Sequence, residues 1–207
     1  MTKTESLMAD LEQASRIAQE GEITPLLGGP VGLMWGVLIT LIMGFQYLVL
    51  SRILEIPYAS LTIAWIAFGT IGGLGSAILG RAIDRKPGAN SVANRVESYV
   101  WIMYAGTMGA LFIGAVLNMI FGNGDQTLWN TVVVFAFAAQ GLAYGVVAKV
   151  TKLKLLHLSS IASFAVSSVL FIMVDRIEVY LVAAIGAVLT IVIPNLILNA
   201  KIKQNVQ

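Results

Sequence analysis

Six apolar segments, each long enough to cross a lipid bilayer, dominate this chain of 207 residues. A helix rises about 1.5 Å per residue, so about 20 apolar residues are needed to span a hydrocarbon core about 30 Å thick. The segments that meet this length are 30–51, 57–80, 98–121, 127–150, 153–174 and 178–200. The connections between them are too short for a second domain. We therefore predict an all-α membrane protein whose six transmembrane helices form three hairpins.

The basic residues fall almost entirely on one side of this pattern. Of the 13 Lys and Arg residues, only Arg52 and Arg176 lie in the first, third or fifth connection. The remaining basic residues lie in the amino-terminal segment, the second and fourth connections and the tail. Because basic loops stay in the cytoplasm, we expect both termini to be cytoplasmic. The compact loops and the absence of a signal peptide favour a bacterial inner membrane.

The composition argues against enzymatic and metal-binding functions. Only 12% of the residues are charged, against about 25% in a soluble domain. The chain has no Cys, which excludes disulfides and thiolate sites. Zincin, α/β-hydrolase and phosphate-loop motifs are absent, and the single His157 has no carboxylate at a ligating spacing. We expect no catalytic residue, cofactor or metal, and no nucleic-acid partner, since insertion orientation accounts for the basic residues.

Residues 1–27 are predicted to form a cytoplasmic acidic amphipathic helix and a linker before the 28–200 bundle, which a short basic tail, 201–207, follows. The apolar stripe of this amino-terminal helix has helical spacing and comprises Leu7, Leu11, Ala14 and Ala18. Residues 1–22 contain five acidic and two basic side chains. An anionic leaflet repels such a helix. We expect it to bind protein: its own bundle, a second copy or another partner.

Small residues recur every four positions along the first predicted span. They are Gly28, Gly32, Gly36, Thr40 and Gly44. Such a row allows another helix to approach closely. It indicates either packing within one bundle or an oligomer interface on the first span. Similar rows occur at Gly69 and Gly73 in the second span and at Gly106, Ala110 and Gly114 in the third.

Uncharged polar side chains form a second candidate set inside the predicted spans. They are Gln140, Ser159, Ser163, Ser167 and Asn195. These residues either line a polar cavity for a small solute or hydrogen-bond between helices. Pro194 removes a backbone donor and frees a carbonyl, so Asn195 either satisfies a carbonyl locally or faces a ligand. No charged residue occupies the middle third of any span, which argues against proton coupling through a buried carboxylate.

The second connection is the longest cytoplasmic loop. Its Pro87-Gly88 pair predicts a turn, and the residues after the turn are expected to extend the third helix beyond the membrane. Asp84 and Glu97 have Arg neighbours and are expected to form an ion-paired surface.

Two function hypotheses of different classes follow. In the first, a non-enzymatic membrane protein acts through protein contacts as a regulator, accessory subunit or scaffold, binding through the amino-terminal helix or the first span. In the second, the chain is a small transporter or channel for a neutral or apolar solute. A third hypothesis, lipid binding without transport, depends on the glycine-lined grooves.

Overall fold

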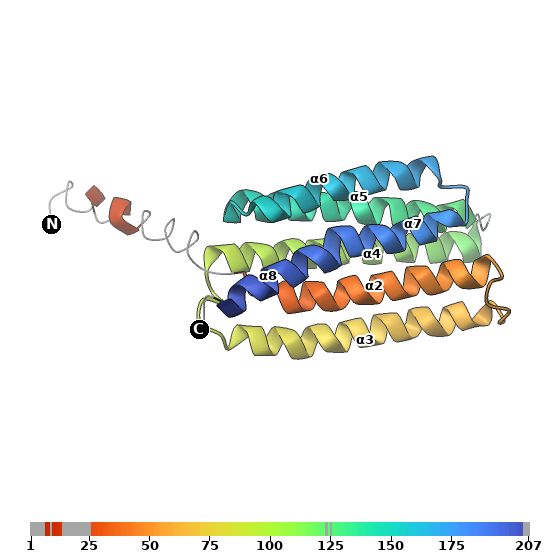
Figure 1. The fold of residues 1–207 in the computed structure, drawn as a ribbon, viewed down its shortest axis with the longest axis horizontal. Coiled ribbons are helices and arrows are strands. Elements are labelled where there is room, and N and C mark those ends of the chain that lie inside the picture. The colour runs from red at the N-terminus through yellow and green to blue at the C-terminus, as the bar shows by residue number, and fades with distance from the viewer. Residues whose placement is uncertain (1–6, 9, 14–25, 123, 125, 205–207) are drawn as a thin grey trace.

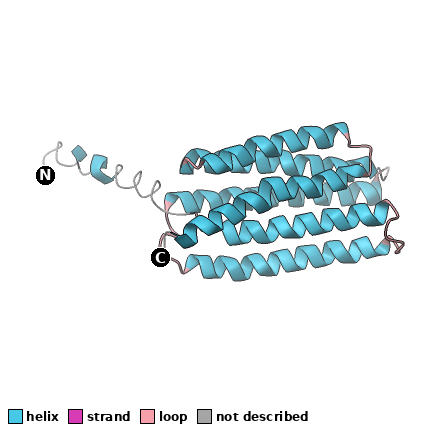
Figure 2. Ribbon diagram, in the orientation of Figure 1, coloured by secondary structure: helices cyan, strands magenta, loops and turns pink. Residues whose placement is uncertain are grey.

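The fold was obtained as a computed structural model that describes residues 7–8, 10–13, 26–122, 124 and 126–204. All regular secondary structure in these residues is helical (Figure 2). Among the described residues, six helical spans are long and apolar enough to cross a bilayer. They are α2 (Gly29–Leu50), α3 (Ala59–Asp84), α4 (Val92–Phe121), α5 (Gln126–Thr151), α6 (Lys154–Ile172), and a last span of α7 (Glu178–Ala187), η1 (Val188–Val192) and α8 (Ile193–Gln204). The predicted all-helical membrane fold is confirmed.

Helix α4 differs most from its predicted bounds, because it begins at Val92 rather than at residue 98. The side chain of Ser91 caps this helix by accepting a hydrogen bond from the backbone N–H of Asn94 at 3.3 Å. The preceding turn contains Gly88, whose φ of +83° favours glycine. With 30 residues, α4 is about 45 Å long, so it outreaches a core about 30 Å thick.

The helices lie side by side, with α3 at one edge of the view in Figure 1 and α6 at the other. The beginning of α2 and the end of α8 lie at the same end of the bundle (Figure 1). The most extensive pairings join α5 to α6 and α2 to α7. Lys152, with φ of +56°, separates α5 from α6 in a tight turn. Because the tightest pair joins helices that the predicted hairpins separate, the three-hairpin description stays a prediction.

Two apolar clusters hold the bundle together. The larger one joins α2, α5, α6, α7 and η1 and includes Phe137, Leu170 and Tyr180. The smaller one lies toward the end where α2 begins and contains Tyr144 and Leu156. Gln140 lies between Phe137 and Tyr144 along α5, so the polar side chains around it separate two apolar regions.

Helices α3 and α4 are peripheral. In α3 only Gly72 is buried, and in α4 only Ala93, Asn94 and Ala115 are. Helix α3 packs chiefly on α2 and α4 chiefly on α5. Both helices therefore present long apolar surfaces to the surroundings of the bundle, as a lipid-facing helix can.

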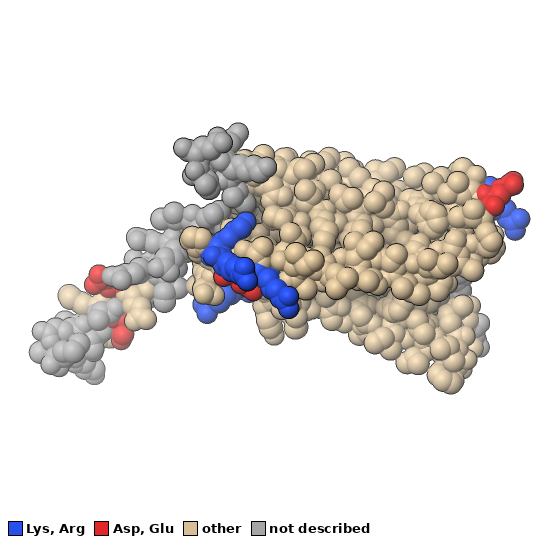
Figure 3. All heavy atoms as spheres, turned by 90° about the horizontal axis from the view of Figure 1, so that it is seen from below, with Lys and Arg blue, Asp and Glu red and all other residues tan. Residues whose placement is uncertain are grey.

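Basic side chains gather at the end of the bundle where α2 begins, which we call the basic end (Figure 3). Its basic residues lie in the α3–α4 and α5–α6 connections and in the helix ends that adjoin them, and they are Arg81, Arg85, Lys86, Arg95, Lys149, Lys152 and Lys154. The opposite end carries Arg52 and Arg176. This distribution is the one that the positive-inside rule describes.

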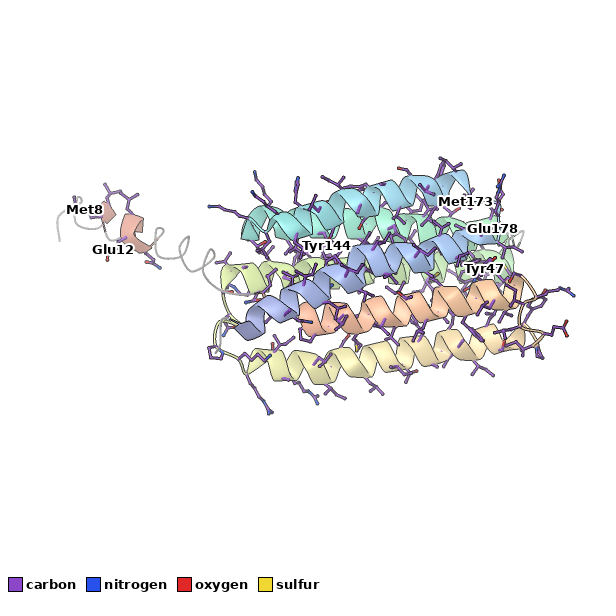
Figure 4. All side chains as sticks on the ribbon, in the orientation of Figure 1. Met8, Glu12, Tyr47, Tyr144, Met173 and Glu178 are labelled. Atoms are coloured by element: carbon purple, nitrogen blue, oxygen red, sulfur yellow. The ribbon has the colours of Figure 1, made fainter. Side chains whose placement is uncertain are left out.

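The described part of the amino-terminal segment is helical at residues 7–8 and 10–13. Its apolar side chains Leu7, Met8 and Leu11 are exposed, and Figure 4 labels Met8 and Glu12 there. Ala14 and Ala18, the other two members of the predicted stripe, lie outside the described residues. At the other terminus, α8 continues to Gln204, past the predicted end of the last span at residue 200.

Candidate functional site

The last span of the same chain packs against two glycines of the small-residue row of α2, Gly32 and Gly36. A Cβ atom added at Gly32 would lie 2.5 Å from Oδ1 of Asn195 on α8. At Gly36 it would lie 2.9 Å from Cγ2 of Ile191 on η1. The absence of side chains at these two positions lets α2 and the last span approach closely. Packing within one bundle therefore accounts for this part of the row.

The outer part of the row behaves differently. Thr40 donates its hydroxyl hydrogen to the carbonyl of Gly36 on its own helix, at 2.8 Å. A Cβ atom added at Gly44 would have no neighbour within 4 Å. The row is thus a contact surface from Gly28 to Gly36 and an open surface at Gly44.

At the basic end, α4 holds the start of α2. The backbone N–H of Leu27 donates to Oδ1 of Asn94 at 2.9 Å, and that of Gly28 donates to Oε2 of Glu97 at 3.3 Å. The first N–H groups of a helix lack partners within it, and a carboxylate is favoured there. Glu97 was expected on an ion-paired surface. Instead its carboxylate accepts a hydrogen bond from the backbone at the start of α2.

A closed hydrogen-bond network lies in the middle of the bundle. Gln140 on α5 donates from Nε2 to Oγ of Ser163 on α6 at 2.9 Å and to Oγ1 of Thr190 on η1 at 2.8 Å. Each hydroxyl in turn donates to its own helix, Ser163 to the carbonyl of Ser159 and Thr190 to that of Gly186. All three side chains are buried. One amide thus links three helices, and both hydroxyl groups donate as well as accept.

The third member of this network sits on a π-helical turn. The N–H of Ile193 reaches back five residues to the carbonyl of Val188, rather than four residues as in an α-helix. Pro194 follows directly and has no N–H to donate to the carbonyl of Thr190. η1 is therefore an irregular turn inside the bundle, and π-helical turns are frequent at functional sites.

The predicted polar set divides into separate contacts. Ser159 donates to a carbonyl of its own helix, and Ser167 donates to the carbonyl of Val134 on α5 at 2.9 Å. Asn195 donates from Nδ2 to the hydroxyl of Tyr144 at 3.3 Å and to a carbonyl of its own span; Figure 4 labels Tyr144 inside the bundle. The structure therefore brings Gln140 and Ser163 together and leaves the other three in contacts of their own.

Sequence reasoning missed several partners in these contacts. Thr190 carries a hydroxyl group within an otherwise apolar run of residues. The sequence therefore did contain a signal for this partner. The contact of Tyr144 with Asn195 joins residues far apart in the chain and has no local signal. The same holds for Tyr180, whose hydroxyl donates to Oδ1 of Asn130 at 2.5 Å at the other end of the bundle.

Uncharged amides and hydroxyls can donate and accept hydrogen bonds, but they supply neither a strong general base nor a charged binding group. Within the residues that the structure describes, no three His, Asp or Glu side chains converge on a possible metal position. Comparisons of the chain with protein-family models, curated proteins and solved structures find no match.

Proposed function

We propose that the chain is a non-enzymatic multi-pass protein of a bacterial inner membrane that acts through contacts with other proteins, as a regulator, accessory subunit or scaffold. The observation that carries this proposal is the exposure of the apolar side chains in the acidic amino-terminal segment. Leu7, Met8 and Leu11 are 55%, 68% and 69% exposed. Apolar side chains that are exposed in this way are available for contact with a partner.

The chemistry of this segment favours a protein over a lipid surface. Burying one Leu side chain contributes about 1.5–3 kcal/mol. Burial of the exposed Leu7 and Leu11 side chains against a partner would therefore stabilise the complex. Asp10 and Glu12 lie beside them, and acidic groups are repelled by an anionic leaflet. An apolar groove with basic residues at its rim is the partner surface that complements both properties.

The interior of the bundle supports the same proposal. The hydroxyls of Ser163 and Thr190 both donate and accept hydrogen bonds within the protein. Such bonds between spans stabilise a membrane bundle by about 0.6–2 kcal/mol each. This use of the polar side chains is structural and needs no solute.

Leu11→Asp tests the proposal. The substitution replaces an exposed apolar contact by a charge and should remove a stoichiometric partner from the complex purified in mild detergent. Intact mass and identification of the copurified proteins measure the result. Gln13→Asp is the matched control, because Gln13 is exposed on the same helical piece and receives the same charge without losing an apolar group.

We expect Gln13→Asp to retain the partner. If Leu11→Asp retains it equally, or if the unmodified protein carries no second protein, the proposal is wrong. Circular dichroism of both variants should show unchanged helix content, since neither position is buried.

A transporter or channel for a small neutral solute is the second candidate, and the π-helical turn favours it. Irregular backbone near the middle of a membrane is typical of transporter binding sites, and η1 places Thr190 against Gln140 there. Gln140→Leu should then abolish the swelling of proteoliposomes in glycerol or urea while leaving the protein folded. Swelling of the unmodified protein at the rate of protein-free liposomes would exclude this candidate for those two solutes.

A further inference from the structure

We propose that two copies of this chain associate in the membrane through the outward face of α3. This face, which we call the α3 seam, consists of Gly69, Gly73, Ala77, Gly80 and Asp84. The inference concerns a different element from the amino-terminal segment and goes beyond the function proposed for it.

The two faces of α3 differ in what their glycines contact. A Cβ atom added at Gly72 would overlap Cη2 of Trp35, and one added at Gly75 would overlap Sδ of Met34. These contacts attach α3 to α2. The other glycines of α3, which are Gly69, Gly73 and Gly80, have nothing within 4 Å of an added Cβ atom. The seam therefore has no partner within the described part of the chain.

The seam is continuous. Its members follow one another at spacings of three or four residues, which places them on one side of a helix. From Gly69 to Asp84 the helix extends about 22 Å. Small residues on such a face let two backbones approach closely, and that packing drives helix association where lipid removes the hydrophobic driving force.

Charges at the end of the seam point to a second copy as the occupant. Asp84 and Arg81 are both exposed, and neither forms an ion pair or a hydrogen bond through its side chain in the part of the chain that the structure describes. Asp84 had been expected to pair with its Arg neighbours. Two copies inserted in the same direction bring their α3 helices together in parallel, and a two-fold axis then places Asp84 of each copy near Arg81 of the other.

The two reciprocal pairs make the face self-complementary, as a two-fold interface must be. Exposed ion pairs contribute only about 0–1 kcal/mol each, so they select the partner and its register while the seam supplies the packing. Helix α4 also presents open glycines at Gly106 and Gly114. Its acidic Glu97, however, already binds the start of α2, so α4 lacks the same charge pattern.

Counting copies in a bilayer tests the proposal. The chain has no Cys, so the substitution Lys154→Cys provides a single position for a fluorescent label. Lys154 is exposed at the start of α6 and lies on a different helix from the α3 seam. Photobleaching steps of the labelled protein in liposomes, over a range of protein-to-lipid ratios, yield the dimer dissociation constant. Gly73→Leu should raise that constant at least tenfold. Gly106→Leu is the matched control, with the same substitution at an equally open site, and should leave it unchanged.

The charge pair adds a second, independent measurement. Arg81→Asp and Asp84→Arg should each weaken the dimer severalfold, and the double variant should restore it, because the exchange recreates opposite charges across the axis. A monomer at every ratio, or a Gly73→Leu protein that dimerises like the unmodified one, would overturn the proposal. Leu11→Asp should leave the copy number unchanged, so failure here is distinguishable from failure of the partner-binding proposal.

Discussion

Gly32→Ala should lower the free energy of unfolding by about 1–3 kcal/mol, the usual effect of overpacking. The added methyl group would lie 2.5 Å from Oδ1 of Asn195 and 2.8 Å from its Cγ. The Asn195 side chain cannot adopt another rotamer without cost, because its amide nitrogen donates hydrogen bonds to the hydroxyl of Tyr144 and to the carbonyl of Ile191. Relief therefore requires either loss of these hydrogen bonds or separation of α2 from α8.

Equilibrium unfolding in mixed mild-detergent and dodecyl sulfate micelles, followed by circular dichroism, measures this change. Gly44→Ala is the control on the same helix, because nothing lies within 4 Å of its added Cβ atom. Ala favours a helix over Gly by up to about 1 kcal/mol, so this variant should be as stable as the unmodified protein or slightly more stable. Equal destabilisation at both positions would contradict the close approach of α2 and the last span.

Gln140→Ala should lower the free energy of unfolding by about 2–4 kcal/mol. The substitution removes the hydrogen bonds to Ser163 and Thr190 and leaves an unfilled space between three helices, and the cost of such a cavity dominates. Gln140→Leu should cost about 1 kcal/mol or less, because Leu fills the space and both hydroxyls still donate to their own helices.

The same unfolding assay separates these outcomes. Leu142→Ala serves as the control, since Leu142 lies on the same helix and is 65% exposed, so its truncation leaves no internal space. If Gln140→Leu destabilises the protein as strongly as Gln140→Ala, the amide hydrogen bonds rather than packing hold the three helices together.

Local sequence signals accounted for the turn between α3 and α4. The Pro87-Gly88 turn and the extension of α4 beyond it both appear in the structure, because a Pro-Gly turn and a Ser cap act within a few residues of one another. The pairing of Glu97 with the start of α2 was not predictable in this way. It joins residues 69 positions apart, and Arg neighbours in the sequence suggested a different partner.

The sequence also could not predict which face of each helix is buried against other helices. In a soluble helix, apolar periodicity marks the buried side. Lipid is as apolar as the interior of a membrane bundle, so α3 and α4 are apolar all round and carry no such mark. The sequence showed small residues at four-residue spacing in both α2 and α3. Only the structure shows that Asn195 and Ile191 pack against glycines of α2, whereas Gly69 and Gly73 have no neighbour.

The sequence by itself determined the number of spans, because bilayer thickness requires long apolar runs from which charged side chains are excluded. It also contained the one-sided distribution of basic residues that the positive-inside rule describes. The tertiary structure decided which polar groups meet. Gln140, Ser163 and Thr190 share one network, while Asn195 belongs to another contact. A hydrogen bond between helices depends on their relative rotation and depth, and neither property is a function of the local sequence.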